Sequence, residues 1–256
     1  EKSWIGDWFK WALPLLPKIN QSINTYYPGT KLAFTEYNYG AGDHISGGIA
    51  TADVLGIFGK YGVYLSTYWG SNKAYVNSAF SLYRNYDGAN STFGDTRVRA
   101  AMTDKVNSSI YGSTFLADRN KLHMIVLNKN YTQSIIGNFS IAAPQYYTSA
   151  RVWAFDSSSS VITERTPVSA ISGNSFNYTI PPLTACHFVI RSDRPAGDLS
   201  GDCQVSIEDL DLFAERWLDI EDCSGIDCGD LNHDTEINLL DMAILAHNWL
   251  RGVACQ

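Results

Sequence analysis

The last sixty residues hold the feature that most constrains the fold, a duplicated pattern of oxygen-bearing side chains. The pattern starts at residue 198 and again 32 residues later, at residue 230. Loop positions 1, 3, 5, 7, 9 and 12 are Asp198, Ser200, Asp202, Gln204, Ser206 and Asp209 in the first copy and Asp230, Asn232, Asp234, Glu236, Asn238 and Asp241 in the second. Calcium loops that lead into a helix have this ligand spacing. We therefore predict two calcium-binding loops in the tail.

Each loop is followed by apolar residues at helical spacing. These residues are Leu210, Phe213 and Trp217 after the first loop, and Met242, Leu245 and Trp249 after the second. A duplicated loop–helix unit of this size resembles a dockerin, the calcium-dependent docking module of secreted polysaccharide-degrading enzymes. The resemblance implies a small all-α, paired EF-hand-like module over residues 197–256. It also implies two Ca²⁺ ions and a cohesin-like or cell-surface scaffold protein as partner.

Two departures from the dockerin pattern bear on affinity and partner choice. Loop position 6 is normally Gly because its φ is positive, but here it is Cys203 or Thr235. Dockerins often carry hydroxyl residues at loop positions 10 and 11, whereas this chain carries Ile207-Glu208 and Leu239-Leu240. The calcium affinity is therefore open, and a more apolar contact with the partner is expected.

Charge is distributed unevenly along the chain. Residues 197–256 carry 14 acidic and 2 basic side chains (−12), and residues 1–196 carry 12 acidic and 17 basic (+5), for a total of −7. The basic residues are scattered, so we expect no nucleic-acid-binding face. No apolar run approaches the ~20 residues needed to span a membrane, so no membrane span is expected.

Cysteine usage favours an oxidising compartment. Four of the five cysteines lie in the tail, namely Cys203, Cys223, Cys228 and Cys255. One or two disulfides are favoured over zinc because C-x-x-C pairs are absent, and three pairings are possible. Cys186 lies in an apolar run and is expected in the core. Because the chain starts at Glu1 without a secretory signal, we expect a mature or truncated C-terminal piece of an extracellular protein, secreted or attached to the cell surface.

The first hundred residues alternate helical and strand patterns. Helical spacing covers residues 15–26, 49–61 and about 74–86, and strand-like runs cover residues 32–34 and 63–67. Polar residues at the strand ends are typical of a parallel α/β barrel. Two strands are too few to close an eight-stranded barrel. Residues 1–103 are therefore expected to be the C-terminal portion of a TIM-like (β/α)₈ barrel whose other strands precede Glu1.

The pattern changes to a period of two over residues 104–192. Apolar alternation covers residues 122–127, 135–141, 150–155, 176–180 and 186–190, with turn residues between the runs. This spacing predicts an antiparallel β-sandwich. A short hinge containing Pro195 separates it from the tail. The expected fold is multidomain, with a partial barrel, a sandwich and a calcium-loop module.

Three segments carry a resemblance to a known family. They are TEYNYG at residues 35–40, DHISGGIA at residues 43–50 and ADVLGIFG at residues 52–59. These segments resemble the C-terminal end of the catalytic domain in glycoside hydrolase family 44, and the resemblance extends over residues 1–191. The family comprises retaining endo-β-1,4-glucanases built from a TIM-like barrel with an attached β-sandwich. The resemblance thus implies a secreted cellulase or xyloglucanase that hydrolyses β-1,4-glucan polysaccharides.

Glu36 is the candidate catalytic residue. Retaining glycosidases use two carboxyl groups ~5–5.5 Å apart, one as nucleophile and one as acid/base. Glu36 follows a predicted buried strand, where a barrel holds its chemistry, although a surface carboxylate is the alternative. The resemblance implies that Glu36 is the nucleophile and that the acid/base lies upstream of Glu1. The chain alone is therefore expected to be inactive.

Aromatic residues are the candidate substrate contacts. The resemblance implies that Trp4, Trp8 and Trp69 line the glucan cleft, because indole rings pack on the C–H faces of sugars. Core packing is the alternative, chiefly for Trp4 and Trp8, which lie four residues apart. Tyr37 and Tyr68 are expected to hydrogen-bond sugar hydroxyls or simply to pack.

One histidine and one alternative function complete the expectations. His44 lies in a Gly-rich loop beside Asp43 and is expected to be a structural hydrogen-bonding residue instead of a catalyst. A non-catalytic carbohydrate-binding or surface-anchoring protein, derived from such an enzyme, is the alternative function. A second catalytic Glu upstream would distinguish the two.

Overall fold

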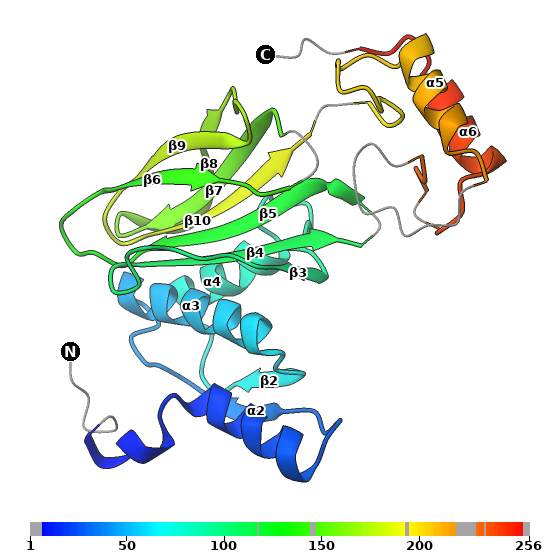
Figure 1. The fold of residues 1–256 in the computed structure, drawn as a ribbon. Coiled ribbons are helices and arrows are strands. Elements are labelled where there is room, and N and C mark those ends of the chain that lie inside the picture. The colour runs from blue at the N-terminus through cyan, green and yellow to red at the C-terminus, as the bar shows by residue number, and fades with distance from the viewer. Residues whose placement is uncertain are drawn as a thin grey trace.

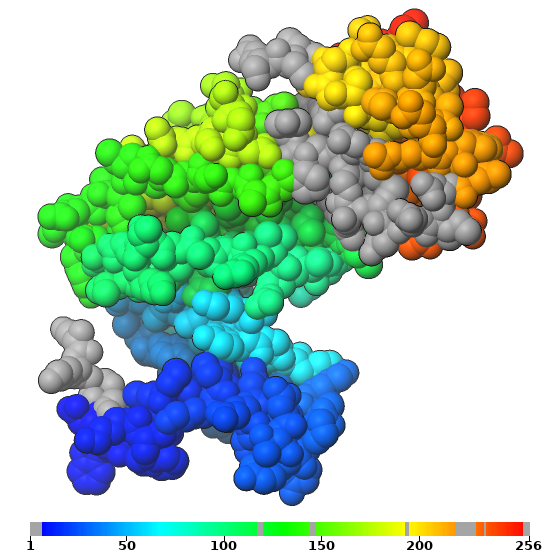
Figure 2. All heavy atoms as spheres, viewed as in Figure 1, coloured from blue at the N-terminus to red at the C-terminus, as the bar shows by residue number. Residues whose placement is uncertain are grey.

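The computed structural model describes residues 7–116, 118–143, 147–192, 195–218, 229–232 and 234–252. Trp4 and three of the tail cysteines, Cys223, Cys228 and Cys255, therefore lie outside the described residues. The α/β segment, the sheets and the tail follow one another along the chain and in space (Figures 1 and 2). In the space-filling view, α2 and the tail lie at opposite ends of the molecule (Figure 2).

Strands and helices alternate over the first 84 residues, as the sequence predicts. The elements are η1 (Lys10–Ala12), α2 (Leu15–Tyr26), β1 (Ala33–Tyr37), α3 (Ile45–Tyr61), β2 (Leu65–Tyr68) and α4 (Ala74–Arg84). β1 and β2 pair in parallel. The order from β1 to α4 is the predicted strand–helix–strand–helix order.

Helix α3 begins four residues earlier than its apolar spacing predicts. The pair Gly47-Gly48 suggests a break, yet both residues lie inside the helix and are buried. A Cβ at Gly47 would collide with the carbonyl group of Ala41, so glycine allows the loop to approach the first turn closely. The helix ends at Gly62, whose φ of 69° suits a left-handed cap.

Helix α3 is apolar on two sides because it is buried from two directions. Ile45, Ile49 and Ala52 pack, together with Ala79 and Leu82 of α4, against the large sheet. Val54 and Phe58 pack in another cluster with Leu16 of α2, against Phe34 of β1. The helix pair α3–α4 thus lies between the β1–β2 pair and the sheets (Figure 1).

Eight antiparallel strands form two sheets. The six-stranded sheet has the order β3-β4-β5-β10-β7-β8, and β6 pairs with β9. The bounds are β3 (Thr96–Val98), β4 (Ser108–Phe115), β5 (Asp118–Asn128), β6 (Ile135–Ser140), β7 (Ser149–Asp156), β8 (Ser159–Val168), β9 (Ser175–Ile180) and β10 (Thr184–Arg191). Strands β5, β6, β7, β9 and β10 match the five predicted runs.

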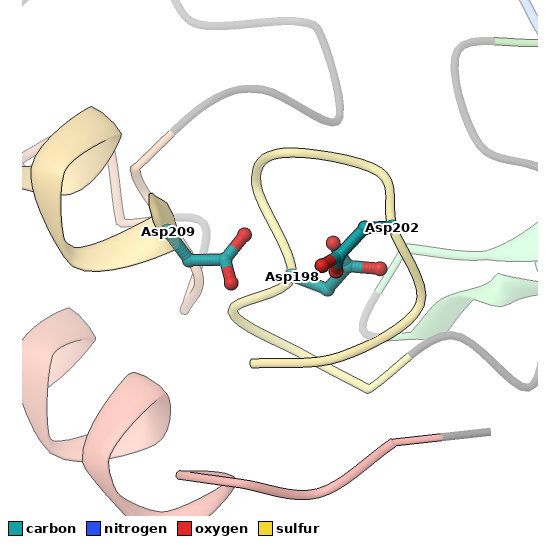
Figure 3. Close-up of side chains that lie close together, drawn as sticks. All are labelled: Asp198, Asp202 and Asp209. Carbon is teal, nitrogen blue, oxygen red and sulfur yellow. The ribbon is translucent and has the colours of Figure 1, made fainter. Parts of the chain in front are cut away.

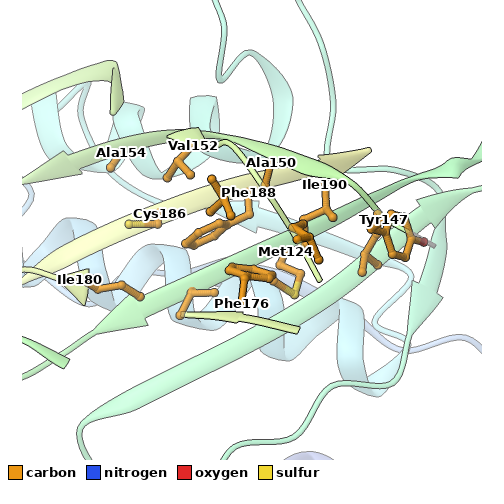
Figure 4. Close-up of a cluster of buried hydrophobic side chains, with 14 residues drawn as sticks. Met124, Tyr147, Ala150, Val152, Ala154, Phe176, Ile180, Cys186, Phe188 and Ile190 are labelled. Atoms are coloured by element: carbon orange, nitrogen blue, oxygen red, sulfur yellow. The ribbon is translucent and has the colours of Figure 1, made fainter. Parts of the chain in front are cut away.

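The two sheets share one core (Figure 4). Alternate residues of β10 face opposite ways, so Cys186 and Phe188 contribute to this core while Ala185 packs toward the helices. Phe176 of β9 lies with its ring centroid 6.2 Å from that of Phe188. The predicted core position of Cys186 is confirmed, since it is buried and free.

The tail contains α5 (Ile207–Glu215) and α6 (Leu239–His247), one after each loop. Within the part of the tail that the structure describes, the buried core residues are Leu199, Val205, Phe213, Ile237 and Leu245. The N–H of Leu218, after α5, donates to the carbonyl of Ile237, while the N–H of Leu250, after α6, donates to that of Val205. Each loop therefore pairs with the chain that follows the other helix. Among the tail cysteines, Cys203 is described and is disulfide-bonded, as the cysteine pattern predicts.

Candidate active site and calcium loops

Glu36 lies in an irregularity of strand β1. Phe34 pairs with Ser66 and Tyr37 with Tyr68, so two residues of β1, Thr35 and Glu36, face one residue of β2. This is the arrangement of a β-bulge, which bends a strand and redirects its side chains. The bulge places Glu36 near the carboxyl end of the parallel pair, where barrel enzymes carry their chemistry.

The helix side of β1 is filled with aromatic rings. The ring centroids of Phe34 and Tyr37 each lie 5.2 Å from that of Phe58 on α3. Phe34 and Tyr37 lie three residues apart and still contact the same ring, because the bulge interrupts the alternation of side chains along β1. Glu36, inside the bulge, is exposed.

Trp69 stands at the same end of the parallel pair as Glu36. Its N–H donates to the carbonyl of Tyr37 over 3.0 Å. Its carbonyl accepts a hydrogen bond of 2.5 Å from Nδ2 of Asn38, whose Oδ1 accepts from the N–H of Gly40. The indole is 67% exposed. The Asn38 side chain thus links the ends of β1 and β2 through the backbone of Trp69. The Trp69 ring itself is exposed and accessible to a ligand.

Tyr37 and Tyr68 pack against the helices. Their ring centroids lie 5.7 Å apart, and that of Tyr68 lies 5.9 Å from Phe80 on α4. Burial raises the pKa of the Tyr37 hydroxyl, which keeps it protonated at neutral pH. These contacts favour the packing alternative, and hydrogen bonding from either hydroxyl to a sugar stays a prediction.

The other sequence candidates separate into two groups. Trp8 is 76% exposed, so core packing does not describe it, and its place in a cleft stays a prediction. His44 caps α3, because its Nδ1 accepts a hydrogen bond from the N–H of Ser46. The structural role predicted for His44 is confirmed.

The two loops of the tail gather carboxylates. One oxygen from each of Asp198, Asp202 and Asp209 lies within 4.8 Å of the others, and the second loop repeats this with Asp230, Asp234 and Asp241 (Figure 3 shows the first set). Position 6 has a φ of 68° at Cys203 and 77° at Thr235. The loops therefore adopt the positive φ that calcium loops need there, although neither residue is glycine.

The carboxylates of loop positions 1 and 12 are also hydrogen-bonded by backbone N–H groups. Asp198 accepts from Gly201 and Cys203, each at 2.8 Å. Asp209 accepts from Ser200 and Ser206, each at 2.7 Å. These bonds hold the two carboxylates in place within the loop.

Calcium fits this donor set. Calcium–oxygen distances of ~2.3–2.6 Å place ligands on opposite sides of the ion ~5 Å apart, which matches the spacing of the clustered oxygens. Ser206 and Asn238 at position 9 act as helix caps, accepting from the N–H groups of Glu208 and Leu240. At loop position 3, the hydroxyl of Ser200 donates to Asp198 over 3.4 Å and Nδ2 of Asn232 donates to Asp234 over 2.8 Å. Gln204 and Glu236 occupy loop position 7, and their part in binding a cation stays a prediction.

Sequence reasoning missed the role of Asn38. Its residue type and its place in TEYNYG were visible, but its hydrogen bond spans 31 residues and depends on the pairing of β1 with β2. The bulge was missed for the same reason, since a register shift involves two strands.

Comparisons with known proteins identify endoglucanases similar to this chain. Endoglucanase A of Paenibacillus lautus is 51% identical over 213 residues, which are 82% of this chain and 30% of that protein. A family 44 endoglucanase from Clostridium acetobutylium ATCC 824 superposes with a TM-score of 0.73 and 60% identity, over 75% of this chain and 38% of the other. The solved neighbours named here belong to glycoside hydrolase family 44.

A second neighbour is a family 44 xyloglucanase from Paenibacillus polymyxa, solved with xyloglucan. It has a TM-score of 0.72 and 50% identity over 75% of this chain and 38% of the other. No family model matches the chain. The chain spans less than two fifths of the length of these three proteins. Among the described residues, no helix has both the length and the apolar character needed to cross a bilayer.

Proposed function

We propose that this chain is the C-terminal part of a retaining endo-β-1,4-glucanase of glycoside hydrolase family 44. The observation that carries the proposal is that Glu36, in the bulge of β1, and the exposed Trp69, directly after β2, lie at the same end of the parallel strand pair. In this proposal residues 1–103 belong to a TIM-like barrel and residues 104–192 to a β-sandwich. The similarity to an endoglucanase and a xyloglucanase supports β-1,4-glucan as the substrate class.

The chemistry follows from the two residues. The Glu36 carboxylate attacks the anomeric carbon while a second carboxylic acid, outside this chain, protonates the leaving oxygen. Water then cleaves the glycosyl-enzyme ester, and the second group takes the proton. Trp69 offers its exposed ring to the C–H face of a sugar, and Asn38 holds the backbone of Trp69 against the end of β1.

The Glu36→Gln substitution in the full-length protein tests the assignment. The amide keeps the shape of the side chain but cannot form the glycosyl ester, so turnover of soluble β-glucan should fall by several orders of magnitude, ~10³ or more. A fluorinated glycoside inactivator should label the peptide that contains Glu36, as read by mass spectrometry. Glu215→Gln, an exposed position on α5, is the matched control and should keep full activity.

Two results would contradict the catalytic assignment. One is an active Glu36→Gln enzyme, and the other is labelling of a different peptide. A third result is that the unsubstituted full-length protein folds normally but neither hydrolyses β-glucan nor reacts with the inactivator. That result would favour the alternative function, a non-catalytic carbohydrate-binding or anchoring protein.

Residues 197–256 are proposed as a dockerin-like module that binds two Ca²⁺ ions and docks on a cohesin-like or cell-surface scaffold protein. The two carboxylate clusters and the positive φ at Cys203 and Thr235 support calcium binding. The exposed apolar residues at loop positions 10 and 11, Ile207, Leu239 and Leu240, support a docking surface. A docking module and a disulfide at Cys203 suit an extracellular location.

A further inference from the structure

A groove with no catalytic candidate in it lies between helix α4 and strands β7 and β8. Its volume is about 550 Å³, within the ~300–1,000 Å³ range of ligand sites. Asn77 and Ser81 of α4 line one wall, and Arg151 and Glu164 line the other. Glu36 and Trp69 do not line it. The groove is therefore separate from the candidate active site.

The sheet wall of the groove is held in a fixed arrangement. The guanidinium group of Arg151 makes two hydrogen bonds to the carboxylate of Glu164, of 2.7 and 2.9 Å. It also lies 4.6 Å from the centre of the Trp153 ring. Glu164 pairs across the strands with Trp153, so the three side chains share one face of the sheet. The guanidinium and carboxylate groups are thus already held in position in the free protein. This lowers the conformational entropy that is lost when a ligand binds.

The end of the helix wall is equally fixed. Oδ1 of Asp87 accepts from the N–H groups of Ala89 and Ser91, at 2.9 and 3.4 Å. Asn85 caps the helix end, and its Oδ1 accepts from the N–H of Asn90 at 2.7 Å. Local hydrogen bonds therefore position the polar groups that border this end of the groove.

The chemistry of the lining selects a class of ligand. Asp87 and Glu164 carry negative charge against one positive charge on Arg151, so the groove does not favour anions such as phosphates. Hydroxyl and amide groups such as those of Ser81 and Asn77 both donate and accept, as sugar hydroxyls do. Val161, 63% exposed, gives an apolar patch at the rim for a sugar C–H face.

We propose that this groove binds a stretch of neutral glycan chain away from the candidate active site. The class of ligand follows from the groove, and its identity as β-1,4-glucan rests on the proposed function. A second contact of this kind holds the polymer on the enzyme between cleavage events, because a tethered chain rebinds at high effective concentration.

The test measures binding, not turnover, on the whole chain. Cellohexaose is titrated by calorimetry in a Trp69→Ala background, which removes the exposed ring of the candidate active site. Ser81→Trp fills the groove from its helix wall, and it should weaken binding by about tenfold or more. Ser22→Trp, at an exposed position of helix α2, is the matched control and should leave the affinity unchanged.

A second variant keeps the test informative if Ser81→Trp does not fold. Arg151→Met removes the planar fork from a half-exposed strand position and should also weaken cellohexaose binding, while leaving the circular dichroism spectrum unchanged. In NMR titrations the shifted signals should include the indole N–H of Trp153.

The proposal is overturned if the Trp69→Ala chain does not bind cellohexaose at millimolar concentration, or if both groove variants bind it normally. Tighter binding of an anionic oligogalacturonide than of cellohexaose would overturn the assignment to neutral glycans. None of these outcomes depends on Glu36, so a failure here is distinguishable from a failure of the catalytic proposal.

Discussion

Two histidines face each other in the interior, between α4 and the six-stranded sheet. Nδ1 of His187 lies 2.7 Å from the carbonyl oxygen of Leu82 and must donate to it, so Nε2 of His187 accepts from Nδ1 of His123 over 3.0 Å. The ring of Tyr86 covers His187 at 4.0 Å. Burial favours the neutral form of His187, in which Nε2 carries no proton and accepts from His123.

This geometry predicts acid sensitivity of the sheet core. Burial, and then the neighbouring His123, lowers the pKa of His187 to about 3, whereas an unfolded histidine titrates near 6.5. Below pH ~6.5 this histidine binds a proton in the unfolded chain but stays neutral in the folded chain. The free energy of unfolding therefore falls as the pH drops toward 3, by up to ~1.4 kcal/mol per pH unit. Urea unfolding of the chain at a series of pH values between 7 and 4, monitored at Trp153, measures this slope.

The variant His187→Asn should lower the overall stability but flatten its pH dependence between pH 6 and 4. His247→Gln, an exposed histidine on α6, should change neither. An unchanged slope in His187→Asn would show that other groups cause the acid sensitivity.

At the scale of single residues, the sequence predicted those roles that local pattern determines. His44 before a helix is an example, because its position indicates the N–H groups that its side chain can cap. Glu36 was expected one residue after a strand and lies inside β1, because the bulge lengthens the strand, and its catalytic role stays a prediction. The His123–His187 pair joins residues 64 positions apart and needed the β5–β10 register to become visible.

At the scale of elements, helix α3 carries two glycines with opposite surroundings. A Cβ at Gly56 would overlap the ring of Tyr111, whose hydroxyl donates to Asp53 of the same helix over 2.5 Å. A Cβ at Gly59 would meet nothing within 4 Å. Glycine is thus required by packing at the first position and is replaceable at the second.

Substituting each glycine by alanine tests this difference. Gly56→Ala should destabilise the fold by ~1–3 kcal/mol, because the ring of Tyr111 must shift and its hydrogen bond to Asp53 is strained. Gly59→Ala should be neutral or stabilising by up to ~1 kcal/mol, because alanine has the higher helix propensity. Chemical denaturation of both variants provides the comparison. Equal effects would mean that the close approach of Tyr111 to α3 does not limit packing.

The calcium loops make a prediction for the tail. Carboxylates gathered within 4.8 Å repel one another until a cation arrives, so calcium should raise helicity and melting temperature, and chelation should reverse both changes. The Asp198→Ala, Asp230→Ala double variant should lose the calcium-induced change in circular dichroism and the binding of a docking partner. The disulfide at Cys203 should preserve some structure without metal.

Asp211→Ala is the matched control, since Asp211 is an exposed residue of α5 that takes no part in the carboxylate clusters. It should bind calcium normally. Calorimetry that detects no calcium binding at millimolar metal would rule out the proposed docking module.

Among the strands, apolar alternation predicted β5, β6, β7, β9 and β10 and missed β3, β4 and β8. β4 is an inner strand but places the polar residues Ser109 and Ser113 at buried positions, and β3 and β8 lie at the two edges of the six-stranded sheet. β8 includes Ser159, Arg165 and Pro167, residues that edge strands tolerate because one side of the strand needs no partner. The sequence of β8 therefore resembles that of a loop, and its pairing with β7 is needed to identify it as a strand.

At the scale of the whole molecule, the open face of β1 and β2 predicts that the 256-residue chain is catalytically inactive. Two parallel strands leave Glu36 exposed to water, and the acid/base group implied by the resemblance lies elsewhere. Assays of the purified chain on soluble β-glucan should show no turnover above that of its Glu36→Gln variant. Activity that depends on Glu36 would show that this chain already holds a complete site.

The place of β10 in the sheet has a consequence for biosynthesis. The final strand of the sheet to leave the ribosome pairs with both β5 and β7, which are complete at residues 128 and 156. A further 63 residues must be synthesised between the end of β5 at residue 128 and the end of β10 at residue 191. At ~5–20 residues per second, this synthesis takes on the order of 3 to 13 s, and during that time the β10 side of β5 has no partner strand. During that interval the nascent chain exposes two strand edges that other chains can join. We therefore expect proteins that bind exposed strand edges to compete for this chain before β10 is synthesised.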